Sequence, residues 1–438
     1  MEKLKDANQI IKEVTEVINF VPNNLRWLTE TETIFFDNEH LKTSILLDII
    51  HSIRVKYNIY DKKDSEDGFA LNGSILMKNY GNHYAKYMKF LLDGSDLNRV
   101  QILRNTKPHM AGKRSKMFAL NNYYLEENYF YFKNSNKKAV NRKKKQLQDL
   151  LLDKDYSPIP LDIRNRLYND ITKFYIEEFD AIHTLDVLRE NGEITKHKRD
   201  SNIQTVQMIV NGVIEFSADK HGRLHTIFTR LKREIRKNNL KVLTENGLEE
   251  TVEFDIPNSQ PTMFLFILRD FLSEIDMDDY IKYRITCKTG NFYQLIIDYY
   301  KSGGKNITRK DAKGIIYTYL FGPVIKLTGK RKAKESRRII RTAFIKIFGK
   351  SIDNWLTNYK NNHPDKYNAF SWLLQNYESK IIFDTIIREI KEVDPNIPII
   401  TVHDSIIVPK SKKDIVFKIF NKHMDQIFED VDIELEYA

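Results

Sequence analysis

Residues 397–410 read IPIITVHDSIIVPK, a run of branched apolar residues that is interrupted by His403, Asp404 and Ser405. Branched apolar runs of this length predict strands that are buried in a sheet. An unpaired carboxylate inside such a strand costs several kcal/mol or more. Two interpretations are therefore open. The tripeptide forms a hairpin turn, in which Asp and Ser are common, or Asp404 is a metal ligand with partners elsewhere in the chain.

A second predicted strand also ends in a carboxylate, because TVEFDIPNSQ carries Asp255. Two aspartates on adjacent strands of a sheet would bring their oxygens within reach of one pair of magnesium ions. Mg²⁺ takes one or two protein carboxylates and completes its octahedron with water and phosphate oxygens. Two such ions, about 3.5–4 Å apart, clamp the attacking and leaving oxygens of a phosphoryl transfer. Strand-end aspartates are common, so these two residues alone do not establish a metal site, and other motifs are needed.

A third segment, TRKDAKGIIYTYLFGP, carries Arg309, Lys313, Tyr317 and Phe321, followed by Gly322. Spacings of four, eight and twelve residues are close to whole turns of an α-helix, so the four side chains share one face. Two cations followed by two aromatics suit a nucleoside triphosphate. The alternative is an amphipathic surface helix with snorkelling cations.

A fourth segment, SADKHGRLHTIFTRLKREIR, contains a D-x-x-G-R pattern formed by Asp219, Gly222 and Arg223. Glycine lets the backbone approach a ligand closely, and the cations Lys232 and Arg236 that follow could track phosphates. The alternative is a turn that precedes a basic helix.

In this order the four elements resemble the single-subunit polymerases of the family A palm group, which contains the family A DNA polymerases and the phage and mitochondrial RNA polymerases. The match covers about residues 200–438 and includes Gln375, which corresponds to the Gln that precedes the last motif. A rival segment, RRIIRTAFIKIFG, places Arg341 where the third motif has Lys and has a shorter spacing. We therefore prefer residues 309–322 for this motif.

The resemblance implies that Asp255 and Asp404 hold two Mg²⁺ ions. It also implies that Arg309 and Lys313 bind the incoming triphosphate, with Lys313 assisting the pyrophosphate leaving group. Tyr317 would lie against the base or sugar. The remaining implied nucleotide contacts are Phe321, Gly322 and Gln260.

The resemblance further implies contacts with nucleic acid. Arg223 would contact the template–product hybrid, and His403 the end of the growing strand. The other implied nucleic-acid contacts in this region are Lys232, Arg236 and Gln375.

The nature of the product stays open at this point. His-Asp-Ser is similar to the RNA polymerases, whereas Phe321 replaces their Tyr and the aromatic Tyr317 is similar to the DNA polymerases. Gln260 stands where DNA polymerases place Glu and RNA polymerases place Gly. We lean to a DNA-directed RNA polymerase, with a family A-like DNA polymerase as the alternative. No exonuclease motif precedes this region, so we expect no proofreading.

The expected fold is α+β, with a palm that contains a small antiparallel sheet and with helical fingers at about residues 290–350. We expect this polymerase domain at residues 191–438, where TVQMIVNGVIEFSA reads as a strand. Residues 1–190 would form a mostly helical region. In it, HYAKYMKFLLDG and the two strands RVQILRN and SKMFALNNYYL are typical of a winged-helix module, with Lys113 and Arg114 near the wing tip.

The composition supports a nucleic-acid partner only weakly. The 438 residues contain 70 Lys and Arg against 60 Asp and Glu, a net charge of +10, which favours a polyanionic partner. The single cysteine, Cys287, excludes internal disulfides and suits a reducing cytoplasm. No apolar stretch is long enough to span a membrane. An origin in a phage or mobile element is compatible with this composition.

The expected partners are a DNA template, an RNA or DNA product strand and nucleoside triphosphates. The region that precedes the motifs is short compared with the promoter-binding domains of phage RNA polymerases, so initiation would fall to a partner subunit or to the wing. The competing hypothesis is a non-catalytic winged-helix protein of DNA replication or regulation. It predicts that Asp255 and Asp404 lie far apart.

Overall fold

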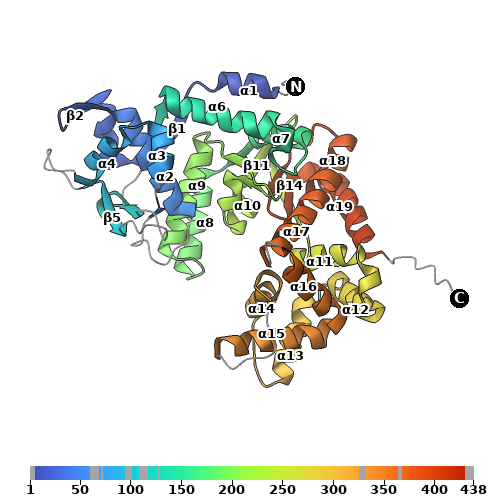
Figure 1. Cartoon of the computed structure of the whole chain (residues 1–438). Helices are drawn as coiled ribbons and strands as arrows, with labels where there is room; N and C mark the ends of the chain where they lie inside the picture. Colours follow the sequence, from blue (N-terminus) through green and yellow to red (C-terminus); the bar gives the residue numbers. More distant parts are fainter. Residues whose placement is uncertain are drawn as a thin grey trace. The chain divides into compact units, whose positions relative to one another are not determined.

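The computed structural model describes residues 5–59, 69–70, 73–93, 101–107, 117–125, 129–324, 332–363 and 367–429. These residues form helices and small antiparallel sheets, as an α+β fold requires. The chain divides into two units whose segments alternate along the sequence (Figure 1). The first comprises Met1–Asp153, Tyr175–Glu215 and Arg230–Leu240, and the second comprises Lys154–Phe174, Phe216–Thr229 and Lys241–Ala438. Segments on both sides of residue 190 thus belong to each unit.

The first unit is built around helix α2 (Thr43–Ile59), which packs against strand β1 (Val17–Pro22). β1 pairs antiparallel with β7 (Tyr129–Asn134), so segments more than 100 residues apart share one core. The shorter elements nearby are α1 (Ala7–Glu13), β2 (Thr33–Phe36), β3 (Glu39–Lys42), α3 (Gly73–Tyr80) and α5 (Asn122–Leu125).

The predicted helix and two strands of the winged segment are confirmed as elements. They are α4 (Tyr84–Asp93), β5 (Leu103–Lys107) and β6 (Met117–Leu120), and β5 pairs antiparallel with β6. A short third strand, β4 (Phe69–Ala70), pairs with the other edge of β6. The predicted tip residues Lys113 and Arg114 lie outside the described residues, so their contact with nucleic acid stays a prediction.

One expected strand is wrong. Thr205–Val210 lie in helix α9 (Lys196–Val210), which begins at the N-cap Thr195, and only Phe216–Ala218 form a strand, β9. The β-branched residues that suggested a strand are instead used for packing, because Val206 is buried while α9 lies against α8 (Glu178–Glu190). Tertiary packing overrides a weak β preference here. The other helices of this unit are α6 (Lys137–Leu152) and α10 (Arg233–Asn239).

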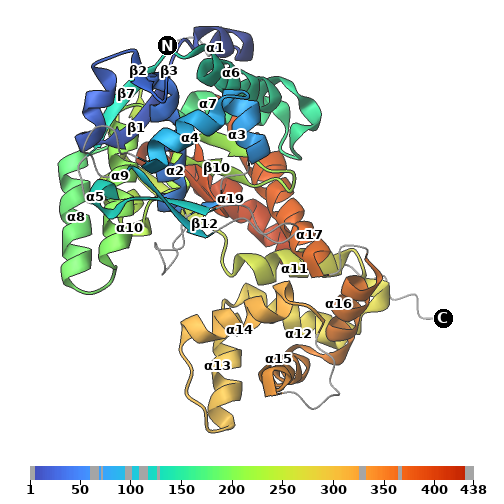
Figure 2. The ribbon, with the colours of Figure 1, turned by 60° about the vertical axis from the view of Figure 1, so that its left-hand side comes forward.

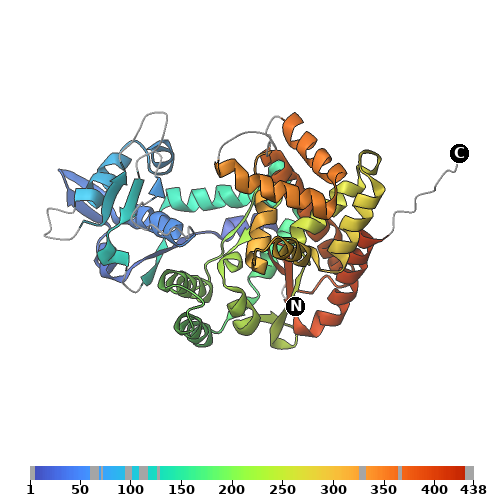
Figure 3. The same cartoon turned by 90° about the horizontal axis from the view of Figure 1, so that it is seen from below.

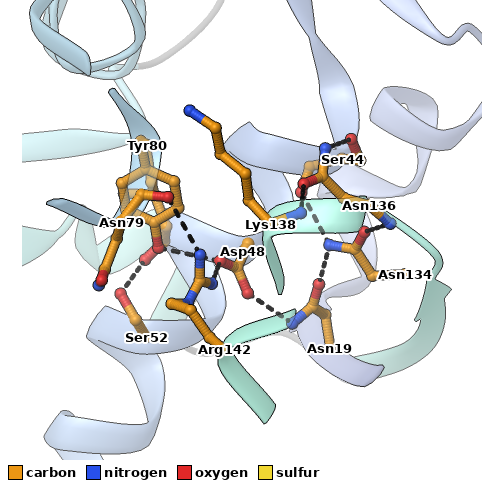
Figure 4. A network of polar contacts seen from close by, with 11 residues as sticks. Asn19, Ser44, Asp48, Ser52, Asn79, Tyr80, Asn134, Asn136, Lys138 and Arg142 are labelled. Carbon is orange, nitrogen blue, oxygen red and sulfur yellow. Dashed lines mark hydrogen bonds and ion pairs between the residues drawn. The ribbon is translucent and has the colours of Figure 1, made fainter. Parts of the chain in front are cut away.

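A buried polar network joins the elements of the first unit (Figure 4). Asp48 of α2 accepts hydrogen bonds from the Tyr80 hydroxyl at 3.0 Å and from Asn19 at 3.3 Å, and it forms an ion pair with Arg142 of α6. Asn134 of β7 donates to Asn19 at 2.6 Å. Because a buried carboxylate is tolerated only when it is paired and hydrogen-bonded, this network fixes where α2, α6 and the β1–β7 pair meet.

In the second unit the sheet strands have the order β13-β14-β12-β11. The long strand β12 pairs antiparallel with both neighbours, and helix α19 (Lys413–Phe428) covers one face, where Phe420 contacts Phe254. The strands are β11 (Leu240–Thr244), β12 (Gly247–Asp255), β13 (Ile400–Val402) and β14 (Ser405–Pro409), and the short strand β8 (Phe174–Ile176) belongs mostly to the first unit.

Asp170 anchors the start of β13. It lies at the end of α7 (Leu161–Ile171) and is fully buried, and its Oδ2 accepts from Lys391 Nζ at 2.6 Å and from the Ile399 backbone at 3.1 Å. Burial lowers the pKa of Lys391 to about 8, although the Asp170 charge opposes this shift. The edge hairpin is thus held by a segment more than 200 residues earlier in the chain.

The rest of the second unit is helical, as predicted for the residues up to about 380. Helices α13 to α16 pack against one another (Figures 2 and 3) around buried aromatic rings, in which Phe292 stacks on Phe348 at 4.5 Å. The helices are α11 (Ser259–Arg269), α12 (Met277–Lys288), α13 (Phe292–Ser302), α14 (Arg309–Phe321), α15 (Lys332–Phe348), α16 (Lys350–Asn362), α17 (Tyr367–Ser379) and α18 (Arg388–Val393). In the described ranges, no helix is long and apolar enough to cross a membrane.

We predict that Asp48→Ala destabilises the first unit, because it removes the acceptor of the buried Asn19 and Tyr80 side chains and leaves the half-buried Arg142 charge without its partner. Removal of one member of a buried ion pair costs about 3–5 kcal/mol. Amide hydrogen exchange in α2 should report this loss as faster exchange. Lys145→Ala, which removes the exposed pair with Asp149, is the matched control and should change stability by less than about 1 kcal/mol. Equal effects of the two changes would contradict the role given to the network.

Candidate functional site

The tripeptide that interrupts the apolar run forms the turn of a β-hairpin. β13 and β14 pair with Val402 opposite Ser405, which leaves His403 and Asp404 as the two turn residues. His403 has φ +56°, a left-handed conformation that few non-glycine residues adopt. The flanking strand residues are buried, whereas His403 is exposed and Asp404 is half-buried. The carboxylate is therefore outside the sheet interior, at the end of the hairpin.

Asp255 lies at the same end of the sheet. It is the last residue of β12 and pairs with Ser405, the residue that follows Asp404. The Ser405 hydroxyl donates to Asp255 Oδ1 at 3.3 Å. Directly opposed residues of antiparallel strands have Cα atoms about 4.5–5.5 Å apart, so the register places Asp255 opposite the residue that follows Asp404, at the same end of the sheet.

The D-x-x-G-R segment is a tight turn between β9 (Phe216–Ala218) and β10 (Leu224–Thr226). Asp219 Oδ1 accepts from the backbone amides of His221 at 2.9 Å and Arg223 at 3.0 Å, which closes the turn. Gly222 has φ +86°, and a Cβ there would come within 2.5 Å of Ser379. Asp and Gly are thus required for the close packing of this turn on Ser379, and Arg223 follows from it.

Glu378 connects these segments, and sequence reasoning missed it. Its side chain is 6% exposed and lies at the end of α17. Oε2 accepts from Gln260 Nε2 at 2.6 Å and from the Ser259 hydroxyl at 3.3 Å, while Oε1 lies 3.9 Å from Arg223 Nε. Burial, with a smaller contribution from the Asp404 charge, raises the pKa of Glu378 to about 7, against the lowering effect of Arg223. A carboxyl group in this state is a feature of functional sites.

Two backbone features place this carboxyl group. Asn258, at φ +49°, turns the chain sharply from β12 into α11 and so brings Ser259 and Gln260 close behind Asp255. Directly after Glu378, residues Lys380–Ile387 form a π-helix, a rare conformation that often occurs at functional sites. A small hollow beside Glu378 is lined by Gly222, Arg223, Leu224, Ser379, Ile382, Phe383 and His403.

The predicted cationic face is present on α14. The helix begins with a capping box between Thr308 and Asp311, and its buried residues are Ala312, Ile316, Tyr319 and Leu320. Arg309 and Lys313 are exposed, and Tyr317 and Phe321 are half-buried. The four predicted residues therefore share a face that is not part of the core.

These side chains contact one another and α13. The Lys313 ammonium lies over the Tyr317 ring at 5.3 Å, and the Tyr317 ring meets Phe321 edge-on at 5.4 Å. Gly322 is the C-cap of the helix and has extended backbone, and a Cβ at this position would lie 2.3 Å from the Thr318 carbonyl oxygen. The cations and aromatics are thus arranged along one line that ends at a required glycine.

The two placements of this motif differ in the surroundings of the second cation. Arg341, which belongs to the rival segment, is bound to Asp353 through its Nε at 2.8 Å and its Nη2 at 2.7 Å. Its side chain is 12% exposed, so it is committed to a buried ion pair. Lys313, the corresponding cation of the segment at 309–322, is exposed.

A buried lysine holds the end of α14. Lys360 of α16 donates to the carbonyl oxygens of Tyr319 at 2.9 Å and Gly322 at 3.1 Å. A cation at a helix C-terminus is favourable because the carbonyl dipoles point toward it. Burial nevertheless lowers the pKa of Lys360 to about 7. No sequence pattern had identified this residue.

The carboxylate pair and the cationic face are on different elements of the second unit. α17 packs against both α11 and α14, and so connects the two groups. The two cations contact tyrosine rings, Arg309 that of Tyr293 and Lys313 that of Tyr317. Gln375 of α17 donates to Ser371 at 3.4 Å within its own helix, and its contact with nucleic acid stays a prediction.

One of the predicted nucleic-acid contacts is not supported. Arg236 is 9% exposed, and its guanidinium donates to the Leu231 carbonyl at 2.7 Å. It therefore supports the local fold of the first unit rather than presenting a charge to a phosphate. Lys232 is half-buried and lies 3.7 Å from Glu234. Helical spacing alone could not distinguish a buried from an exposed arginine.

The donor set suits magnesium better than a transition metal. Among the described residues there is no group of three or more His, Cys, Asp or Glu side chains placed to hold a metal ion. Asp255, which is exposed, and Asp404, which is half-buried, are carboxylates of the kind that magnesium binds together with water and phosphate oxygens.

No protein-family model matches the chain, and no curated protein matches it.

We predict that Glu378→Gln changes the pH dependence of stability. The folded-state pKa of about 7 lies above the unfolded value of 4.5, so the folded protein retains a proton that the unfolded chain loses between these pH values. Stability is therefore lost as the pH rises from about 4.5 to about 7. Relative to wild type, the Gln variant should gain up to about 3 kcal/mol between pH 4.5 and pH 8, measured by urea unfolding. A constant difference across this range would contradict the assignment.

Proposed function

We propose that the second unit is a template-directed nucleotidyltransferase that uses two magnesium ions and favours ribonucleotides on a DNA template. The observation that carries the proposal is the register that pairs Asp255 with Ser405 and places Asp404 beside it. The cationic and aromatic face of α14 supports it, because the order and spacing of its motif resemble those of the family A palm group. In this proposal the sheet of β11 to β14 corresponds to the palm, and α13 to α15 correspond to the fingers.

The exposed cations would bind the substrate. Arg309 and Lys313 are one helical turn apart, so they can contact successive phosphates of one nucleoside triphosphate. Tyr317 and Phe321 continue the same face with aromatic rings, against which a base or sugar can pack. Fixed charges of this kind stabilise a transferring phosphoryl group through positioning and electrostatics.

In this proposal, nucleotidyl transfer takes place at the end of the sheet that carries Asp255 and Asp404. The 3′-hydroxyl of the growing strand attacks the α-phosphorus in line, a new P–O bond forms, and the bond to pyrophosphate breaks. Magnesium held by Asp255 and Asp404 supplies charge neutralisation at the attacking and leaving oxygens when it is bound. Lys313 neutralises the charge that develops on pyrophosphate, and Arg223 contacts a backbone phosphate of the product duplex.

The rival hypothesis of a non-catalytic DNA-binding protein is less well supported. It expected Asp255 and Asp404 to lie far apart, whereas they occupy one end of paired strands. The choice between RNA and DNA as product rests on the His-Asp-Ser turn, and a family A-like DNA polymerase without proofreading remains the alternative.

Incorporation on primed and unprimed single-stranded DNA, with ribo- and deoxyribonucleotides supplied separately, tests the proposal. We expect magnesium-dependent extension with ribonucleotides. Extension with deoxyribonucleotides alone would favour the DNA polymerase. If neither substrate is incorporated under any of the four conditions, the proposed activity is wrong.

We predict that Asp404→Ala lowers the rate of incorporation by roughly a thousandfold or more, since charge stabilisation by bound metal is worth several kcal/mol. Affinity for a primed template, measured by fluorescence anisotropy, should stay within about threefold because the hairpin backbone is retained. Asp414→Ala, at an exposed aspartate of α19, is the control and should be fully active. Full-rate synthesis by the Asp404 variant would exclude the metal-binding role.

We predict that Lys313→Ala lowers kcat by roughly a hundredfold, the scale seen when one preorganised charge-stabilising donor is removed. Template affinity should change little, because Lys313 acts on the triphosphate. Lys288→Ala is the control, since Lys288 is an exposed lysine on a different helix, α12. Equal losses of turnover and template affinity would indicate a general binding face instead.

A further inference from the structure

Tyr293 lies beneath the cationic face of α14 and belongs to none of the sequence motifs. It is the second residue of α13, which packs against α14 (Figure 2). Its side chain is buried, with 4% of its surface exposed. The adjacent Phe292 ring contacts it edge-on at 5.8 Å and is itself stacked on Phe348. The Tyr293 ring is therefore fixed by the aromatic core of the second unit.

Tyr293 contacts two side chains of the proposed nucleotide-binding face, one through its ring and the other through its hydroxyl group. The guanidinium of Arg309 lies over its ring, 5.3 Å from the ring centroid. Its hydroxyl forms a hydrogen bond with Tyr317. Burial, and to a smaller extent the neighbouring Tyr317, raise the pKa of Tyr293 above its usual range, so the hydroxyl keeps its proton.

These two contacts span the length of the face. Arg309 and Tyr317 are eight residues apart, about two helical turns or 12 Å along the axis. Arginine has a long, flexible side chain whose ordering costs conformational entropy, and an exposed arginine without a partner would sample many positions. The ring holds the cation, and the hydroxyl holds the second aromatic ring, at a fixed separation.

We propose that Tyr293 is a positioning residue that makes this face specific for a nucleoside triphosphate, rather than for any polyanion. Its ring orders the cation that receives the phosphates, and its hydroxyl orders the aromatic side chain that receives the base or sugar. Lys313 and Phe321 also contact Tyr317, so a fixed Tyr317 ring restricts the positions of these two side chains as well. The inference rests on the proposed function for the identity of the ligand.

The two contacts can be separated by two substitutions. Tyr293→Phe removes the hydroxyl and keeps the ring beneath Arg309, whereas Tyr293→Leu removes both. Tyr300→Phe is the matched control, because Tyr300 is also buried on α13 and its described ring contact is with Tyr299. The probes are ATP and inorganic tripolyphosphate, each with magnesium, and the measurement is the dissociation constant of the full chain by isothermal titration calorimetry.

We expect Tyr293→Phe to weaken ATP binding about threefold to tenfold, the range for loss of one hydrogen bond, and to leave tripolyphosphate binding unchanged within twofold. Tyr293→Leu should weaken tripolyphosphate binding about twofold to fivefold, the range for loss of a cation–π contact at an exposed site, and ATP binding further. Tyr300→Phe should change neither.

An unchanged ATP affinity in Tyr293→Phe, or an equal loss for both probes, would overturn the inference. This variant keeps the packing of the ring, so it decides the question even if Tyr293→Leu does not fold. Binding of ATP by a wild-type chain that incorporates no nucleotide would overturn the proposed function and leave the role of Tyr293 intact. A wild-type chain that binds neither probe would overturn both.

Discussion

The antiparallel register between β12 and β14 is the constraint on which the candidate site depends. Because Asp255 pairs with Ser405, the two-residue turn before Ser405 must place Asp404 at the same end of the sheet. A shift of one residue would turn every side chain of β14 to the opposite face, and all five of its residues are buried. The core that packs against β14 thus enforces the geometry of the carboxylates at its end.

Other segments pack against this end of the sheet, and their contacts leave few alternative positions. The D-x-x-G-R turn needs a glycine to pack on Ser379, and Glu378, one residue earlier, holds Gln260 by a hydrogen bond of 2.6 Å. A buried carboxyl group with these partners is costly unless its environment is complete. Four segments that are distant in sequence, the D-x-x-G-R turn, the β12–α11 turn, the end of α17 and the β13–β14 hairpin, are therefore gathered around one carboxyl group.

Sequence reasoning succeeded where the signal was local and periodic. The strand ends at Asp255 and Asp404 and the face of Arg309 and Lys313 follow from short patterns, because strand alternation and helical spacing leave few alternatives. It failed where contacts with other segments of the chain determine the structure of a residue. The Thr205–Val210 run is β-branched but lies in a helix, and Arg236 has helical spacing but is buried. Glu378, Lys360 and Tyr293 carry no pattern at all, since their surroundings come from other segments.

The alternation of the two units along the chain has a practical meaning for how the protein can be dissected. A fragment that begins near residue 190 would retain β13 but lose Asp170, whose carboxylate holds Lys391 and the Ile399 amide. Such a truncation would therefore leave the Lys391 ammonium group without its carboxylate partner. Neither half is a genetically separable module, and function must be studied by substitution within the intact polypeptide.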